Sequence, residues 1–338
     1  MSLLANDETA APAVRGVAGR PARVAGGLLL AALSAVSFSL SGPLARGLFD
    51  GGWSAGGVLL LRTGLGAILL APFALAALRH RWRTVGRSLH LVGAYALFAV
   101  GGAQFAYFSA VQYMHVGTAL LIEYTAPAAV VAWMWLRHGQ RPGRLTVIGA
   151  VLAAIGLVLV LDVISGADLS ARGVLWALAA MVGCAVYFVI NADDSTGLPP
   201  IALAWLGLLL GTVLIGALAL LGFIPVTTST AEAHYGSVTV PWWLPVILLG
   251  VVTAAVAYGT GVAAARRLGS RLASFIALLE VVSGVAFAWL LLGELPRAIQ
   301  FAGGLLILAG LVVVKLGETP RTLPPYAVLG RGGQPRSR

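Results

Sequence analysis

Residues 114–160 read MHVGTALLIEYTAPAAVVAWMWLRHGQRPGRLTVIGAVLAAIGLVLV. The pattern returns without a gap at residues 268–314 as LGSRLASFIALLEVVSGVAFAWLLLGELPRAIQFAGGLLILAGLVVV. Each copy is an apolar run, a short Gly-x-x-Pro turn and a second apolar run. Apolar segments share Leu and Val by chance, but one fixed offset also aligns rarer residues. These pairs are Trp135/Trp289, Pro142/Pro296, Gly139/Gly293, Gly149/Gly303 and Gly156/Gly310. The pattern indicates an internal duplication.

The composition is that of an integral membrane protein. The chain has 338 residues, of which 59% are hydrophobic and 10% charged, and its mean hydropathy is +0.94. Soluble domains carry about 25% charged residues. Runs of about 20 apolar residues are long enough to cross a bilayer as helices. The single cysteine, Cys184, lies in an apolar run and is interpreted as a small core residue.

The apolar runs predict an all-α polytopic fold with ten membrane spans. They cover 25–45, 55–77, 89–110, 115–136, 145–162, 172–190, 200–221, 242–264, 272–292 and 298–316. With the N-terminus inside, 18 of the 22 Lys and Arg fall in inner segments and three in outer loops. This asymmetry predicts that both termini are cytoplasmic. It also explains the net charge of +10 as a topology signal rather than a nucleic-acid-binding surface.

The duplication and the span count together predict two inverted five-helix repeats, at 25–162 and 172–316. Five is an odd number, so the second repeat enters the membrane in the opposite sense to the first. Inverted repeats are typical of alternating-access transporters with a substrate site near the midplane. Residues 1–24 and 317–338 are expected to be disordered cytoplasmic tails. Residues 223–241 form the longest expected outer loop.

Ionisable residues within the spans are the first candidates for a functional site, because such groups are costly in lipid. They are Arg62, Glu123 and Glu280. Under the repeat offset, Glu123 aligns with Ala277 and Glu280 with Ala126, so the two acids are not equivalent and are expected to have different roles. Polar and aromatic residues on the predicted spans complete the set: Gln104, Tyr107, Tyr124, Tyr187 and Tyr258. Such a lining suits a small organic solute better than a bare ion.

Three interpretations of the charged residues stay open. Arg62 pairs with a glutamate and neutralises a buried charge, or its planar fork binds a substrate carboxylate. In the third, one glutamate binds and releases a proton that drives transport. The polar residues have their own structural alternative, as helix–helix hydrogen bonds or interfacial anchors.

Three common motifs of enzymes and metal sites do not occur in the sequence. There is no phosphate-binding G-x-x-x-x-G-K-[ST] loop, no H-E-x-x-H and no paired-cysteine metal site. The chain is therefore expected to need no cofactor and no metal, and to have no catalytic residues. An integral-membrane enzyme acting on a lipid-linked substrate is the distant alternative.

The chain resembles the EamA domain and, as a whole, a two-domain member of the drug/metabolite transporter superfamily. The resemblance rests on Leu279-Glu280 and residues 288–294 (AWLLLGE) in the second half, and on Ala126-Pro127, Gly139-Gln140 and Pro142 in the first. Gln140 departs from the family pattern, which usually has glutamate there. The resemblance covers residues 25–316 and implies ten helices, cytoplasmic termini, an inner-membrane location and secondary transport.

The functional prediction is a secondary active transporter in the cell membrane that exports a small metabolite, such as an amino acid or similar amphipathic solute, by alternating access. Uptake, or export of toxic amphipathic drugs, is the alternative. The expected partners are the solute, the lipid bilayer and protons as coupling ion, with no nucleic acid, in a monomer or a homodimer.

Overall fold

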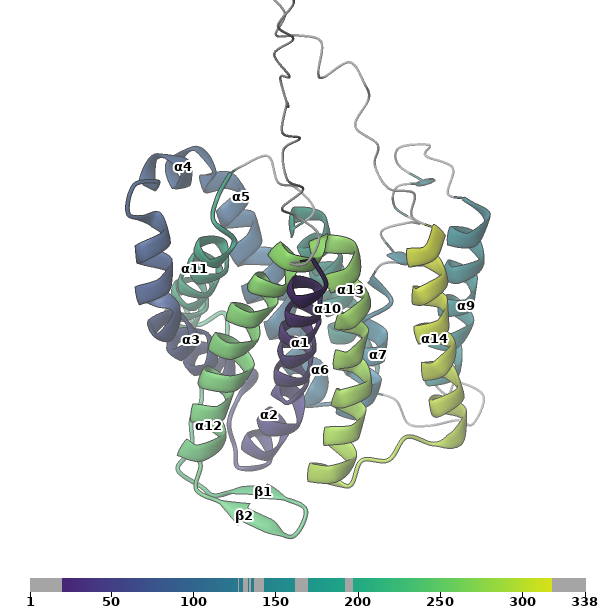
Figure 1. Ribbon diagram of the computed structural model, residues 1–338. Helices are drawn as coiled ribbons and strands as arrows, with labels where there is room; N and C mark the ends of the chain where they lie inside the picture. The colour runs from purple at the N-terminus through teal and green to yellow at the C-terminus, as the bar shows by residue number, and fades with distance from the viewer. Residues whose placement is uncertain are drawn as a thin grey trace, which may run out of the picture.

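The computed structural model is a bundle of helices with one small β-hairpin at one end (Figure 1). The structure describes residues 20–126, 128, 129, 133, 135, 136, 143–161, 170–191 and 197–317. The description leaves out the side chains of residues 20–23, 187–191, 262, 265, 266, 269–275 and 277.

The elements are given in chain order for the two predicted repeats. The first half contains α1 (Arg20–Ser39), α2 (Ser41–Asp50), α3 (Ala55–Leu78), α4 (Trp82–Arg87), α5 (Leu89–Ala94), the π-helix η1 (Tyr95–Gly102), α6 (Ala103–Val111), α7 (Val116–Glu123) and α9 (Arg144–Val160). The second contains α10 (Ala171–Asn191), α11 (Pro200–Leu220), β1 (Ala233–Tyr235), β2 (Val238–Val240), α12 (Trp243–Gly250), the π-helix η3 (Val251–Val256), α13 (Ala257–Leu292) and α14 (Ala298–Gly317).

Six helical segments of the described chain are long and apolar enough to cross a membrane. They are Val24–Asp50, Ala55–Leu78, Leu89–Val111, Pro200–Leu220, Trp243–Gly261 and Ala298–Gly317. Three shorter apolar helices accompany them: Arg144–Val160, Ala171–Val186 and Leu278–Leu292. Large apolar side chains such as Ile68, Phe73 and Phe301 are exposed on the outside of the bundle. Such an apolar surface is the one expected for a protein whose solvent is lipid.

The first span is longer than predicted. The span was predicted to cover residues 25–45, but the helical segment continues through α2 to Asp50. Pro43 is the third residue of α2, and Pro is tolerated in the first turn because the N–H it lacks would have no acceptor within the helix.

The span predicted at 115–136 is broken next to its glutamate. Helix α7 ends at Glu123, and Tyr124 and Thr125 form a turn in which the Thr125 hydroxyl donates to the carbonyl of Ile122 at 2.7 Å. The break is the expected effect of a proline four residues on, since Pro127 has no N–H for the carbonyl of Glu123. Pro127 itself lies outside the described residues.

The spans predicted at 242–264 and 272–292 are joined by helical residues, not by a loop. Gly261 and Gly284 both lie against α1, beside Ser34 and Ser39 respectively. A straight helix would place residues 23 apart about 35 Å from each other, whereas Ser34 and Ser39 are little more than one turn apart. The helical chain therefore reverses its direction between Gly261 and Gly284, as Figure 1 shows at the top of α13.

The expected outer loop at 223–241 contains the antiparallel hairpin of β1 and β2, in which Ala233 pairs with Val240 and Tyr235 with Val238. Gly236 makes the turn with φ of +58°, a conformation that glycine adopts without steric cost.

Helices α9 and α14 pack backbone to backbone through two crossed pairs of glycines. A Cβ on Gly156 would lie 2.6 Å from the carbonyl oxygen of Gly303, and Gly149 stands in the same relation to Gly310. Gly149/Gly303 and Gly156/Gly310 are the pairs that the sequence repeat aligns. Gly156 therefore contacts Gly303, the repeat counterpart of Gly149, and Gly149 contacts Gly310, the repeat counterpart of Gly156. Such reciprocal contacts between antiparallel helices are those of a local two-fold arrangement.

Candidate functional site

Arg62, on α3, is the largest fully buried side chain among the described residues, with 1% exposure. Its Nε donates to the hydroxyl of Thr253 at 2.9 Å, and its Nη2 donates to the carbonyl of Thr253 at 2.9 Å. Its Nη1 donates to Oε1 of Gln104. The rings of Phe108 and Phe38 lie 5.4 Å and 6.0 Å from the guanidinium carbon. A permanently charged group is thus held in an apolar interior by three hydrogen bonds and two aromatic rings.

Thr253 can hold Arg62 because of the π-helix η3. In an α-helix, the N–H of Ala257 would bond to the carbonyl of Thr253. Here it bonds to the carbonyls of Val252 and Ala254, so the Thr253 carbonyl can accept from Arg62. The Thr253 hydroxyl donates to the carbonyl of Leu249 at 2.8 Å, which directs its lone pairs at the guanidinium. Thr253 is absent from the sequence prediction; the available signal was a threonine inside a mostly apolar span.

The second π-helix, η1, lies at the corresponding position of the first half, and Gln104 follows it directly on α6. The repeat offset aligns Gln104 with Tyr258. The Tyr258 ring meets Phe38 edge to face, with ring centroids 4.8 Å apart. π-helical segments are frequent at functional sites because they redirect side chains and free backbone groups. Each of these two π-helices therefore brings one predicted site residue toward Arg62: Gln104 follows η1, and Tyr258 follows η3.

The two glutamates have different surroundings. Glu280 accepts a hydrogen bond from the Tyr124 hydroxyl at 2.6 Å. Glu123 is 8% exposed, and the side chains that the structure describes provide no hydrogen bond or ion pair for its carboxylate. Both carboxyl groups lie within electrostatic range of Arg62. The ion pair found in the described part of the chain joins Arg46 to Asp50, at the end of α2.

Tyr107 is buried beside this cluster with an unsatisfied hydroxyl. The oxygen has no hydrogen-bond partner among the described residues. It lies against Gly42 of α2, where any Cβ would collide with it, and beside the side chain of Val116. An orphaned buried hydroxyl costs about 1–3 kcal/mol, and an unsatisfied buried group of this kind in a folded protein calls for an explanation.

The structure therefore assembles most of the predicted set. Arg62 donates a hydrogen bond to Gln104, and Tyr124 donates one to Glu280. Tyr258 and Tyr107 lie beside these pairs. The side chain of Tyr187 lies outside the described residues. The direct ion pair between Arg62 and a glutamate is not formed in this structure, because Arg62 donates to Gln104 and Thr253 instead. Within the described ranges, His, Cys, Asp and Glu form no group of three that would hold a metal.

A separate apolar cavity of about 490 Å³ lies beside the hairpin. Its lining includes Leu44, Tyr235, Leu248 and Trp289 and none of the predicted site residues. Among the described residues that line it, none is charged. A polar solute needs polar groups to fix its orientation, so this cavity does not have the chemistry of the central cluster.

A family model with the description EamA-like transporter family matches residues 25–162 and 171–316. The chain belongs to this family. It is thereby a member of the drug/metabolite transporter superfamily, and the resemblance inferred from the sequence is confirmed.

Named relatives support the family assignment. The chain is 29% identical to the threonine/homoserine exporter RhtA of Escherichia coli K12 over 302 residues, which cover 86% of this chain and 90% of the relative. It is 24% identical over 230 residues to the uncharacterized inner membrane transporter YicL of Salmonella typhimurium, covering 67% and 73% of the two chains. One crystal structure superimposes with a TM-score of 0.53 at 24% identity, over 88% of this chain and 97% of that chain, which supports the fold.

The two halves of this EamA-family chain are held together at the hairpin end. Oε2 of Glu294 accepts from the backbone N–H of Val116, the first residue of α7, at 2.8 Å. The Tyr235 hydroxyl donates to the carbonyl of Leu44 at 2.7 Å. Burial, with a smaller contribution from Asp50, raises the pKa of Tyr235 well above its ordinary value, so this phenol stays a donor.

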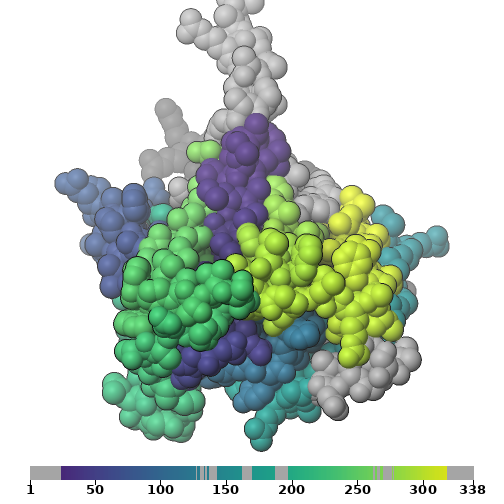
Figure 2. Space-filling view, turned by 90° about the horizontal axis from the view of Figure 1, so that it is seen from below, coloured from purple at the N-terminus to yellow at the C-terminus, as the bar shows by residue number. Residues whose placement is uncertain are grey.

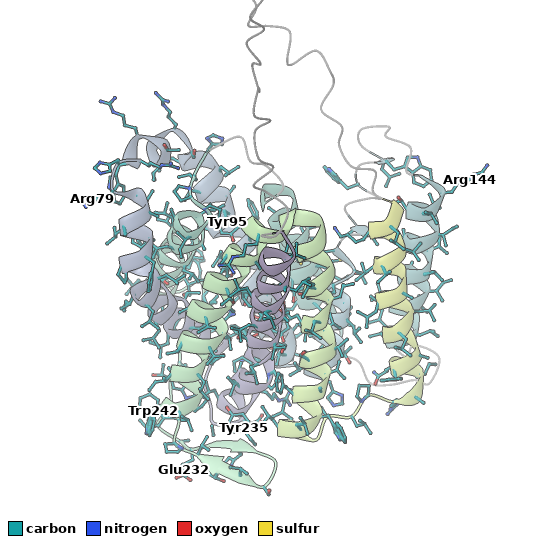
Figure 3. All side chains as sticks on the ribbon, in the orientation of Figure 1. Arg79, Tyr95, Arg144, Glu232, Tyr235 and Trp242 are labelled. Atoms are coloured by element: carbon teal, nitrogen blue, oxygen red, sulfur yellow. The ribbon has the colours of Figure 1, made fainter. Side chains whose placement is uncertain are left out.

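Further contacts join the halves at this end. The Ser54 side chain accepts from the N–H of Thr227 at 2.9 Å, and the rings of Trp53 and Trp242 are 6.0 Å apart. Figure 2, which views the molecule from this end, shows green and yellow segments of the second half beside purple and teal segments of the first. Figure 3 places Tyr235 and Trp242 at this end and Arg79 and Arg144 at the opposite one.

Proposed function

We propose that the chain is a secondary active transporter that exports a small zwitterionic metabolite by alternating access. In this proposal, ten helices form two inverted repeats in the cell membrane, with both termini in the cytoplasm and the hairpin outside. The crossed glycine contacts of α9 with α14 and the matched π-helices support the inverted arrangement. The central cluster around Arg62 is the solute site.

The observation that carries the proposal is the hydrogen bonding of Arg62. A guanidinium has five N–H donors. Three of them bond to Thr253 and Gln104, and two have no acceptor among the described residues. A planar cation with spare donors in an apolar interior suits a carboxylate, which an arginine fork binds with matched geometry. A purely structural arginine would be expected to have its donors satisfied.

The glutamates provide the complementary half of the site. Glu123 has no described partner and Glu280 has one, the Tyr124 hydroxyl. An ammonium group near these carboxylates and a carboxylate on Arg62 together describe an amino acid. Exporters of threonine and homoserine are among the relatives, which supports this solute class. Protons are the coupling ion that we propose, with Glu123 as the carrier because its carboxyl group is not committed to a hydrogen bond.

Uptake of a solute, or export of toxic amphipathic compounds, is the second candidate function. The apolar cavity beside the hairpin favours it, since an amphipathic drug would bind there without polar partners. The distant alternative, an enzyme acting on a lipid-linked substrate, predicts turnover in detergent with no gradient.

Transport in proteoliposomes tests the proposal. Vesicles loaded with radiolabelled threonine are expected to show flux that rises with an imposed pH gradient, and Glu123→Gln is expected to abolish this pH response. Gln keeps the size of the side chain but exchanges no proton. Glu232→Gln is the matched control, since Glu232 is exposed on the hairpin side, and it should leave the response intact. A Glu123→Gln variant with an undiminished pH response would contradict the assignment of Glu123.

The closed hairpin end gives a second prediction, for Glu294→Ala. Loss of a charged hydrogen bond is worth about 1.5–3 kcal/mol, so the ratio of closed to open protein at this end should fall about 10- to 100-fold. The measurement is labelling of a cysteine at Ala119, buried on α7, by an impermeant maleimide in a Cys184→Ala background.

The controls for this measurement are Glu232→Ala and Glu294→Gln. Glu232→Ala should leave labelling low, and Glu294→Gln should have an intermediate effect, because its amide oxygen still accepts from Val116. Labelling of Glu294→Ala that stays at the level of the parent would show that this contact does not hold the end closed.

A further inference from the structure

A cationic surface lies at the end of the bundle opposite the hairpin, where α3 passes into α4. We call it the α3–α4 patch, and it consists of Arg79, Arg81, Trp82, Arg83 and Arg87. All five side chains are exposed, and Figure 3 shows Arg79 at the edge of the bundle. The patch plays no part in the proposed solute site.

The arginines of the patch are not neutralised by the described part of the chain. None of the four makes a hydrogen bond or an ion pair with a described side chain. Along the sequence, no Asp or Glu occurs between Asp50 and Glu123. Arg46, at the other end of the bundle, differs: it pairs with Asp50 and donates to the carbonyl of Val111.

Apolar side chains surround the same patch. Trp82 is 50% exposed, and Leu89 follows α4 with 61% exposure. Along α3, Ile68 and Phe73 are exposed on the approach to the patch. These exposed apolar residues belong to the lipid-facing surface of the bundle. The patch therefore lies where that surface ends, and a tryptophan there is typical of the boundary between hydrocarbon and headgroups.

We propose that the α3–α4 patch is a binding surface for anionic phospholipid headgroups, of the phosphatidylglycerol type. Guanidinium groups bind phosphate oxygens through paired, charge-assisted hydrogen bonds. Each basic residue at an anionic membrane surface contributes favourably to binding. A lipid also provides the acyl chains that Trp82 and Leu89 would contact. This apolar component is the reason to choose a lipid over a free phosphate or a soluble polyanion.

Native mass spectrometry of the full-length protein in detergent tests the proposal. The probes are phosphatidylglycerol and phosphatidylcholine in equal amounts, and the variant is Arg81→Gln/Arg83→Gln/Arg87→Gln. The parent is expected to retain phosphatidylglycerol preferentially. At roughly a fivefold loss of affinity per arginine removed, the variant should lose this preference by about 100-fold.

The matched control removes three exposed arginines elsewhere, as Arg144→Gln/Arg172→Gln/Arg267→Gln. It lowers the net charge by the same amount and should keep the preference. Thermal unfolding without added lipid shows that both variants are folded. Glycerol phosphate and heparin, added as competitors, should not displace the lipid. The proposal is overturned by equal preference in all three proteins, by a loss that the control shares, or by complete displacement with either soluble anion.

Discussion

Arg62→Lys is expected to lower solute transport about 100-fold, because a lost hydrogen bond to a charged group is worth about 1.5–3 kcal/mol and 1.4 kcal/mol is a factor of ten. Lysine keeps the positive charge. Its compact ammonium cannot reach the two acceptors of Thr253 and the Oε1 of Gln104 with the planar fork that arginine provides. Initial rates of threonine flux in proteoliposomes, corrected for the amount of inserted protein, measure the effect.

Two substitutions at Thr253 leave the charge of Arg62 in place and test whether the orientation of its guanidinium matters for transport. Thr253→Ser keeps the hydroxyl that accepts from Nε of Arg62 and should transport at nearly the parental rate. Thr253→Val removes that acceptor and leaves one guanidinium N–H unpaired, so the apparent affinity for the solute should fall while the protein still inserts. Arg172→Lys, on the exposed start of α10, is the neutral control. If Arg62→Lys transports like the parent, Arg62 does not bind the solute and its role is structural.

Gly156→Ala is expected to destabilise the protein by about 2 kcal/mol or more, the cost of forcing a methyl group into a filled contact. The added Cβ would lie 2.6 Å from the carbonyl oxygen of Gly303 and 2.8 Å from the backbone nitrogen of Ile307. Both atoms are backbone and cannot turn aside as a side chain can. The two helices would have to separate along their whole contact. The midpoint of thermal unfolding in detergent is the measurement.

Gly216→Ala is the matched control for this effect. Gly216 also lies inside an apolar helix, α11, but a Cβ there would meet only the end of Leu60 at 3.7 Å, an ordinary contact. Alanine has the higher helix propensity by about 1 kcal/mol, so Gly216→Ala should be neutral or stabilising. Equal midpoints for Gly156→Ala and Gly216→Ala would show that the α9–α14 contact is looser than the structure has it.

Much of the fold follows from the sequence pattern. The aligned glycines at 149, 156, 303 and 310 indicated two related helices, and small residues at helix contacts are a local property of the chain. The family could be inferred for the same reason, since the Gly-x-x-Pro turn and the motif around Glu280 are contiguous in sequence. The first span nonetheless differs from the prediction, since it continues to Asp50 rather than ending at residue 45, and Pro43 lies in the first turn of α2, where it is tolerated. The reversal within α13 falls where the sequence predicted two separate spans, at 242–264 and 272–292, although the residues between them are helical and not a loop.

The candidate site could be predicted only in part. Charge in an apolar run is visible in a sequence, which is why Arg62, Glu123 and Glu280 were found. Thr253 was missed because its role depends on a backbone carbonyl that η3 releases, and π-helical hydrogen bonding has no reliable sequence signature. The hydrogen bond between Arg62 and Thr253 could also not be predicted, because the two residues are 191 positions apart in the sequence.

The sequence by itself determined the membrane class, the duplication, the family and the residues that carry charge into the bundle, because hydropathy and motif spacing are local. Only the tertiary structure decided that Arg62 binds Gln104 and Thr253 rather than a glutamate. It also decided that Glu280 has a hydrogen-bond partner and that Glu294 joins the halves. The physical reason is that each of these contacts joins helices from different halves or from distant parts of one half. Their geometry exists only once α3, α6, α7, η3 and α13 have packed against one another.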